Sequence, residues 1–267
     1  MEQARWAFSD ADLLFLARLF VGGNAEHLQL LQALREDEDI LDGMISDSRL
    51  ADFLLREPEP IVHVSPYLFF AVMLVRVRED LRSRPYTYER DSRRMMVIFD
   101  TREISSLLGD KRVLIYLARM LASFARVQAY SLTVRVRSGV WRRLTFSDFD
   151  VDDLLHLSQS LEERERYPVY KRIADICLFH AGILCSDAQT DMITRRPAGR
   201  EPRDYHSCGR RFYQAACDVA DSRIEDSTFA LKELSHHFGL AAKPLEFMAD
   251  HYIAPLATKV FELPAQN

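Results

Sequence analysis

Arginine side chains recur in the middle of this chain at a spacing that suits the binding of phosphate groups. Arg112, Arg119 and Arg126 stand seven residues apart, so a helix through them carries all three on one face. The segment VRVRSGVWRRLTF at 134–146 follows and sets further arginines around a tryptophan. Arginine pairs with a phosphate through two parallel hydrogen bonds, and tryptophan offers a flat face on which bases stack. The candidate residues for binding DNA, RNA or an acidic partner are Arg112, Arg119, Arg126, Arg135, Trp141, Arg142 and Arg143.

The charge of the chain is unevenly distributed, which supports a polyanionic partner. The formal net charge is −5, yet residues 76–143 hold 16 basic and 7 acidic residues. No acidic residue occurs between Asp110 and Asp148. A basic segment within an acidic chain is typical of proteins that bind nucleic acid or another strongly acidic surface.

Two other interpretations of the basic segment stay open. The acidic residues Asp148, Asp150, Asp152 and Asp153 follow it directly and are placed to neutralise it within the molecule. Alternatively, the basic strip meets an acidic protein partner or another copy of the chain. The protein would then be an interaction or scaffold module, with self-association as one form of it.

A second set of residues has the spacing of metal ligands in helical bundles. Asp153 and His156 are three residues apart, as are Glu233 and His236, so each pair lies on one helix face. Di-metal carboxylate bundles use two Glu-x-x-His pairs together with further carboxylates. The alternative hypothesis is therefore a metal-dependent helical-bundle enzyme. One pair has Asp where such bundles have Glu, and the main hypothesis includes no cofactor.

The chain contains none of the short motifs that identify a reaction. Nucleotide-binding loops of the forms GxGxxG and GxxxxGK[ST] are absent, as are GxSxG and HExxH. The four cysteines show no paired spacing, which favours reduced, buried thiols over a zinc site: they are Cys177, Cys185, Cys208 and Cys217. We therefore lean toward a protein without enzymatic activity.

A helix and a β-hairpin are the elements that would position the basic residues. Residues 110–127 have the broad apolar face of a buried helix, and Asp110 is expected to cap its first turn. Two β-prone runs then flank Arg-Ser-Gly at 137–139, which predicts a hairpin over 131–146 with Val136 opposite Val140. In that register one face is apolar except for Arg142, and the other carries Arg135, Trp141 and Arg143.

Apolar residues recur at three- and four-residue spacing through most of the chain, which predicts a mainly α-helical fold. A second short strand pair is expected at 86–99, where two β-prone runs flank a polar turn. Helical faces run through all parts of the sequence, which favours one integrated domain over residues 1–267. Residues 187–204 are polar and contain two prolines, so we expect a mobile loop there.

Individual helices are expected where this spacing meets capping residues. In the N-terminal third they fall at 25–35 and 47–56 after a first helix capped by Ser9, and Ser65-Pro66 begins a longer one. In the C-terminal third they fall at 205–221, 227–238 and 244–260, the last with Pro244 in its first turn.

The remaining features favour a cytoplasmic protein without a membrane partner. The longest apolar run, YLFFAVMLV at 67–75, is too short to span a membrane. The first residues lack the pattern of a secretory signal. The main hypothesis is a non-enzymatic regulatory or nucleic-acid-binding protein that uses a basic helix–hairpin surface at 110–143.

Overall fold

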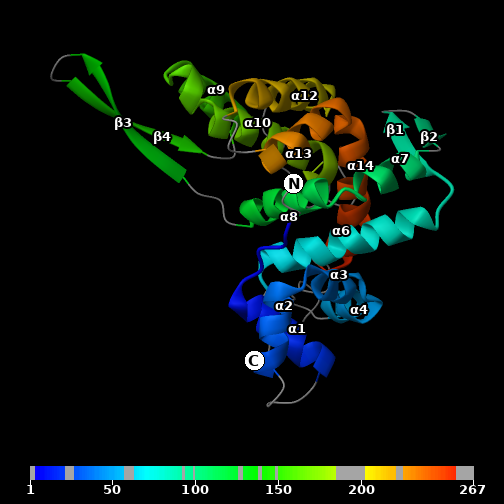
Figure 1. Cartoon of the computed structure of the whole chain (residues 1–267). Helices are drawn as coiled ribbons and strands as arrows, with labels where there is room; N and C mark the ends of the chain where they lie inside the picture. The colour runs from blue at the N-terminus through cyan, green and yellow to red at the C-terminus, as the bar shows by residue number, and fades with distance from the viewer. Residues whose placement is uncertain are drawn as a thin grey trace, which may run out of the picture.

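The structure is a computed structural model, and the described part of the chain is mainly α-helical, as the periodicity predicted (Figure 1). The described residues are 4–21, 27–56, 63–91, 94–98, 100–125, 129–137, 140–147, 150–184, 202–220 and 225–256. For most residues of the two strand pairs, and for a few residues at helix ends, only the backbone is described.

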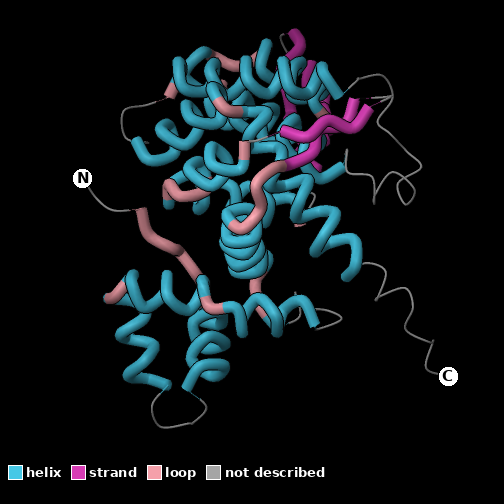
Figure 2. Tube along the Cα trace, turned by 90° about the vertical axis from the view of Figure 1, so that its right-hand side faces the viewer, coloured by secondary structure: helices cyan, strands magenta, loops and turns pink. Residues whose placement is uncertain are grey.

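Four short helices form the N-terminal group: α1 (Asp10–Val21), α2 (His27–Glu36), α3 (Glu38–Ser46) and α4 (Ser48–Arg56). This group occupies one end of the molecule in both views (Figures 1 and 2). Ser9 caps α1 as predicted, because its hydroxyl accepts a hydrogen bond from the Asp12 N–H at 3.2 Å. The buried Asp12 carboxylate also accepts from the Ser65 N–H at 2.8 Å. This bond fixes the start of α1 against the start of the next long helix.

Helices α6 (Pro66–Arg82) and α8 (Lys111–Phe124) pack side by side in the middle of the molecule, with α7 (Thr101–Leu107) before α8. Ser65 caps α6 by accepting from the Leu68 N–H at 3.1 Å, and Pro66 lies in the first turn. Asp110 caps α8 by accepting from the Arg112 N–H at 2.9 Å. Both capping predictions are confirmed, since they depend on local chemistry.

The C-terminal half adds a further layer of helices: α9 (Val151–Gln159), η1 (Glu163–Glu165), α10 (Tyr167–Phe179), η2 (His180–Leu184), α12 (Pro202–Val219), α13 (Glu225–His236), α14 (Phe238–Met248) and η3 (Ala249–Ile253). Helix α10 packs on α12, α12 on α13, and α13 on α8. A Cβ at Gly209 would lie 2.2 Å from the ring of the buried Phe238, so this helix contact requires glycine. Buried side chains from Trp6 to Leu256 join one contiguous core.

Two antiparallel strand pairs complete the described backbone. β1 (Thr87–Asp91) pairs with β2 (Arg94–Ile98), and β3 (Ala129–Arg137) pairs with β4 (Val140–Ser147). The β3–β4 pair projects from the helices in Figure 1. Its register places Arg137, not Val136, opposite Val140. The pairs from Ala129 with Ser147 to Arg135 with Trp141 keep the register that the sequence predicted. Only the pair next to the turn is shifted by one residue, because the strand has an irregularity between Arg135 and Arg137.

One helix was not predicted, and the starts of two others differ from the sequence prediction. Helix α3 was not expected, since it is short, rich in acidic residues and interrupted by Gly43. Helix α14 begins at Phe238, so Pro244 lies inside it and not in the first turn. Burial of α14 in the core outweighs the hydrogen bond that Pro244 cannot donate. Helix α12 begins at Pro202, and the rest of the loop expected at 187–204 lies outside the described residues.

No helix in the described part of the chain combines the length and apolarity that crossing a membrane requires.

Candidate anion-binding site

A pocket of about 240 Å³ lies between the N-terminal segment, α8 and α10; we call it the basic pocket. Among the described residues that line it, four are cationic and none is acidic: the cations are Arg5, Arg112, Arg119 and Lys171. The other lining residues are Ala4, Ile115, Tyr116, Met120 and Ser123. Ile115, Tyr116 and Met120 are buried, whereas Arg5 and Arg119 are exposed. The pocket therefore combines cationic side chains with the buried hydrophobic side chains of Ile115 and Met120, which suits an anion attached to a less polar group.

Arg112 is held in place by two neighbours from different helices. Its guanidinium contacts the Asp110 carboxylate in a bidentate way, with N–O distances of 3.1 and 2.7 Å. The same guanidinium lies over the Phe229 ring of α13, 3.3 Å from the ring centroid. The hydrogen bond from Arg112 lowers the pKa of the Asp110 carboxyl. Asp110 thus stays ionised and orients Arg112 toward the pocket.

Arg5 and Arg119 differ from Arg112, because neither has a carboxylate partner within the described part of the chain. Arg119 lies over the Tyr67 ring of α6, 5.7 Å from the centroid. An aromatic face attracts a cation but does not neutralise its charge. Within the described part of the chain, two positive charges of the basic pocket are therefore without a carboxylate that neutralises them.

Lys171 is positioned by a buried polar cluster at the base of the pocket. Its Nζ donates to Asp175 Oδ2 at 2.7 Å, one helical turn away on α10. The hydroxyls of Tyr116 and Tyr213 donate to Asp175 Oδ1 at 2.6 and 3.0 Å. Burial, reinforced by the negative charge of Asp175, raises the pKa of both tyrosines well above its usual value. The tyrosines therefore stay protonated and serve as donors to Asp175.

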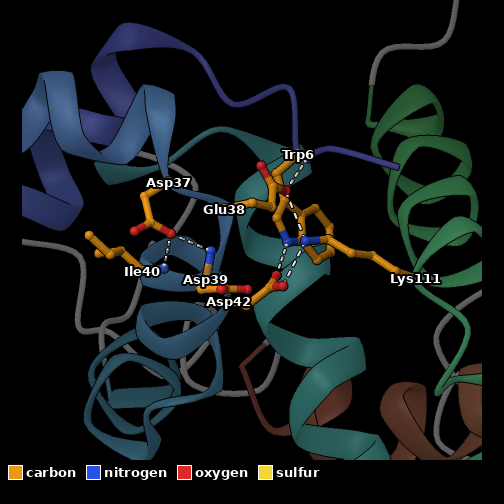
Figure 3. Close-up of polar contacts among 7 residues, drawn as sticks. All are labelled: Trp6, Asp37, Glu38, Asp39, Ile40, Asp42 and Lys111. Atoms are coloured by element: carbon orange, nitrogen blue, oxygen red, sulfur yellow. Dashed lines mark hydrogen bonds and ion pairs between the residues drawn. The ribbon is translucent and has the colours of Figure 1, made fainter. Parts of the chain in front are cut away.

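The N-terminal wall of the pocket is fixed by four residues that we call the Trp6 clamp: Trp6, Glu38, Asp42 and Lys111 (Figure 3). The Trp6 backbone N–H donates to Glu38 Oε1 at 2.7 Å, and the indole N–H donates to Asp42 Oδ1 at 2.6 Å. Lys111 Nζ of α8 bridges the same two carboxylates, at 2.9 and 2.7 Å. The clamp thereby ties the segment that carries Ala4 and Arg5 to both α3 and α8.

The structure brings two of the predicted basic residues together. Arg112 and Arg119 line the same pocket, consistent with their seven-residue spacing on α8. Arg126 lies outside the described residues. The other four candidates belong to β3 and β4, of which only the backbone is described; they are Arg135, Trp141, Arg142 and Arg143. The register pairs Arg135 with Trp141.

The residues predicted as metal ligands are not gathered into a site. Among the side chains that the structure describes, no three His, Cys, Asp or Glu residues lie close enough to hold one ion. Asp153, His156, Glu233 and His236 are all among those side chains. Both histidines are exposed, and His236 Nδ1 is hydrogen-bonded to the Lys232 carbonyl at 2.7 Å. The three-residue spacing places each Asp/Glu–His pair on one face of its helix, but among the described side chains the fold does not bring these two helix faces into contact.

Sequence reasoning missed Arg5 and Lys171, which complete the basic pocket. Nothing in the linear pattern links them to α8, because they come from separate segments that meet only in the folded chain. One signal was present for Lys171: Asp175 stands in the apolar run Ile173–Leu178, and a carboxylate there needs a partner. A lysine four residues earlier on the same helix is the natural one.

Comparison with known proteins yields no relative. No family model matches the chain, no curated protein matches it, and no solved structure matches it. The function is therefore inferred from the site alone.

Proposed function

We propose that this protein is a non-enzymatic, regulatory nucleic-acid-binding protein that uses a basic surface over residues 110–143. The observation that carries the proposal is the basic pocket, where cations from three separate segments converge and no acidic residue is found among the described lining residues. Arginine and lysine in such an arrangement bind phosphate through charge-assisted hydrogen bonds.

The helix and the strand pair would act together in this proposal. Helix α8 ends at Phe124 and β3 begins at Ala129, so the chain passes from the pocket almost directly into the β3–β4 pair (Figure 1). A projecting pair that carries Arg135, Arg143 and Trp141 in its sequence would extend the basic surface beyond the pocket. Phosphates would contact the arginines, and the indole would stack on an unpaired base.

The acidic run after the strand pair does not account for the basic pocket. Asp150 caps α9 by accepting from the N–H groups of Asp152 and Asp153 at 2.8 and 3.1 Å. None of these acids lines the pocket. Arg5 and Arg119 have no carboxylate partner among the described residues, which supports an external anion over internal neutralisation.

An acidic protein partner is the competing function, and a competition assay separates the two. We would follow the binding of labelled single-stranded DNA, single-stranded RNA and duplex DNA by fluorescence anisotropy, with polyglutamate as competitor. The proposal predicts nucleic-acid binding that polyglutamate displaces only at large excess, because polyglutamate offers neither phosphates nor bases. Equal displacement by polyglutamate and by unlabelled nucleic acid would contradict the proposal and support binding of an acidic protein partner instead.

A further inference from the structure

We propose that the basic pocket binds a single phosphate monoester, as found at the end of a nucleic-acid strand or on a free nucleotide. This inference deepens the proposed function and rests on it for the nucleic-acid source of the phosphate. It assigns the pocket a role different from that of the projecting strand pair: the pocket would recognise a terminal group, and the strand pair would follow the backbone.

The charges of the pocket match a monoester better than an internal phosphate. Two of the four lining cations have carboxylate partners, Arg112 with Asp110 and Lys171 with Asp175. Arg5 and Arg119 have none in the described part of the chain, which leaves two positive charges in excess. A phosphate monoester carries about −1.5 to −2 at neutral pH, whereas an internal phosphodiester carries a single negative charge. The two positive charges in excess are therefore matched by the charge of a phosphate monoester and only half matched by that of a phosphodiester.

The size and construction of the pocket also favour a terminal group. Its volume of about 240 Å³ is below the range of roughly 300–1,000 Å³ that is usual for drug-sized ligands. Its lining residues come from the N-terminal segment, α8 and α10, so cations from three segments share one small space. A running phosphate backbone needs an open groove, whereas the last phosphate of a strand can enter a small pocket with its sugar over Ile115 and Met120.

Contacts within the protein hold two of the four cationic side chains of the pocket, and the backbone beside a third, in position before any ligand binds. Asp110 and Phe229 fix Arg112, Asp175 fixes Lys171, and the Trp6 clamp fixes the segment that carries Arg5. Preorganised donors lose little conformational entropy on binding, so their charge-assisted hydrogen bonds contribute to affinity.

The test compares one oligonucleotide sequence in three forms: with a 5′-phosphate, with a 3′-phosphate, and with hydroxyls at both ends. Adenosine monophosphate and adenosine form a parallel pair in calorimetric titrations. We expect one phosphorylated end to strengthen binding by about 10-fold or more over the hydroxyl form, since hydrogen bonds to charged groups are strong. We expect the monophosphate to bind and adenosine not to bind.

Variants assign the preference to the pocket. Arg119→Gln and Arg5→Gln each remove an exposed cation that has no carboxylate partner, so both should fold, which thermal unfolding checks. Each should lose most of the preference for the phosphorylated end. Arg18→Gln is the matched control, because Arg18 is an exposed arginine on α1 outside the pocket. It should keep the full preference.

The outcomes separate the two proposals. Equal affinity for all three oligonucleotides, with no monophosphate binding, would overturn the inference and leave nucleic-acid binding intact. Monophosphate binding that Arg119→Gln abolishes, without oligonucleotide binding, would support the phosphate site and overturn the proposed function. A preference for phosphorylated ends that survives in both pocket variants would also overturn the inference.

Discussion

Asp175 is the buried carboxylate that holds Lys171 and two tyrosine hydroxyls beside the pocket. We expect two substitutions of Asp175 to lower the stability of the protein by different amounts. The residue is 1% exposed and accepts hydrogen bonds from Tyr116, Tyr213 and Lys171. Asp175→Leu keeps a similar volume but leaves both tyrosine hydroxyls without their acceptor. Asp175→Asn keeps one oxygen for the tyrosines and loses the ion pair with Lys171.

The contacts set the size of the effect. A buried donor without a partner costs about 1–3 kcal/mol, and breaking a buried charged group's contacts costs about 3–5 kcal/mol in all. We therefore expect Asp175→Leu to lower the free energy of unfolding by about 4 kcal/mol. The melting temperature should fall by about 8–16 °C, since proteins of this size lose roughly 2–4 °C per kcal/mol. Asp175→Asn should cost about half as much, because the ammonium of the half-exposed Lys171 can turn to water.

A combined variant tests the reasoning itself. If unsatisfied tyrosine hydroxyls are the cause, adding Tyr116→Phe and Tyr213→Phe to Asp175→Leu should recover part of the lost stability. Thermal unfolding followed by circular dichroism measures all four proteins. Further loss of stability in the triple variant, or no difference between Asp175→Leu and Asp175→Asn, would contradict the account.

Three further predictions concern other parts of the fold. Burial lowers the pKa of His180 from 6.5 to about 4. Between these pH values the imidazole is protonated in the unfolded chain but not in the folded chain, so the free energy of unfolding should fall by up to about 3 kcal/mol from pH 6.5 to pH 4. Urea unfolding across this range should show a smaller loss in His180→Gln, and an unchanged loss would contradict the assignment. Gly209→Ala should destabilise by about 1–3 kcal/mol because its Cβ would meet Phe238, whereas Gly43→Ala, with nothing within 4 Å, should be neutral or stabilising; equal effects in thermal unfolding would refute this. Trp6→Phe removes the indole donor to Asp42 and should speed proteolysis of the N-terminal segment, with an unchanged rate counting against the clamp.

Local chemistry determined which parts of the fold could be predicted. Ser9, Ser65 and Asp110 begin helices because their side chains accept hydrogen bonds from the next turn, and this information is contained in a few neighbouring residues. The start of α14 was wrong because tertiary burial, which no local pattern reports, carries a helix through Pro244.

In the candidate site, too, the residues that follow from a local pattern could be predicted, and those brought together by tertiary folding could not. Arg112 and Arg119 share a face because a helix has a fixed period, so sequence spacing placed both at the pocket. Arg5 and Lys171 could not be predicted, since folding alone brings the N-terminal segment and α10 to α8. The metal hypothesis used the same helical period, but it also needed two helix faces to meet, and within the described side chains they do not.

The salt dependence of nucleic-acid binding tests the central claim most directly. The logarithm of the affinity should fall linearly with the logarithm of the salt concentration, because each phosphate contact releases counterions. Arg119→Glu should weaken binding by about 10-fold and reduce the magnitude of the slope by about 1. Arg18→Glu changes the net charge by the same amount away from the pocket and should leave the slope unchanged. Equal slopes in both variants would contradict a nucleic-acid contact at the basic pocket.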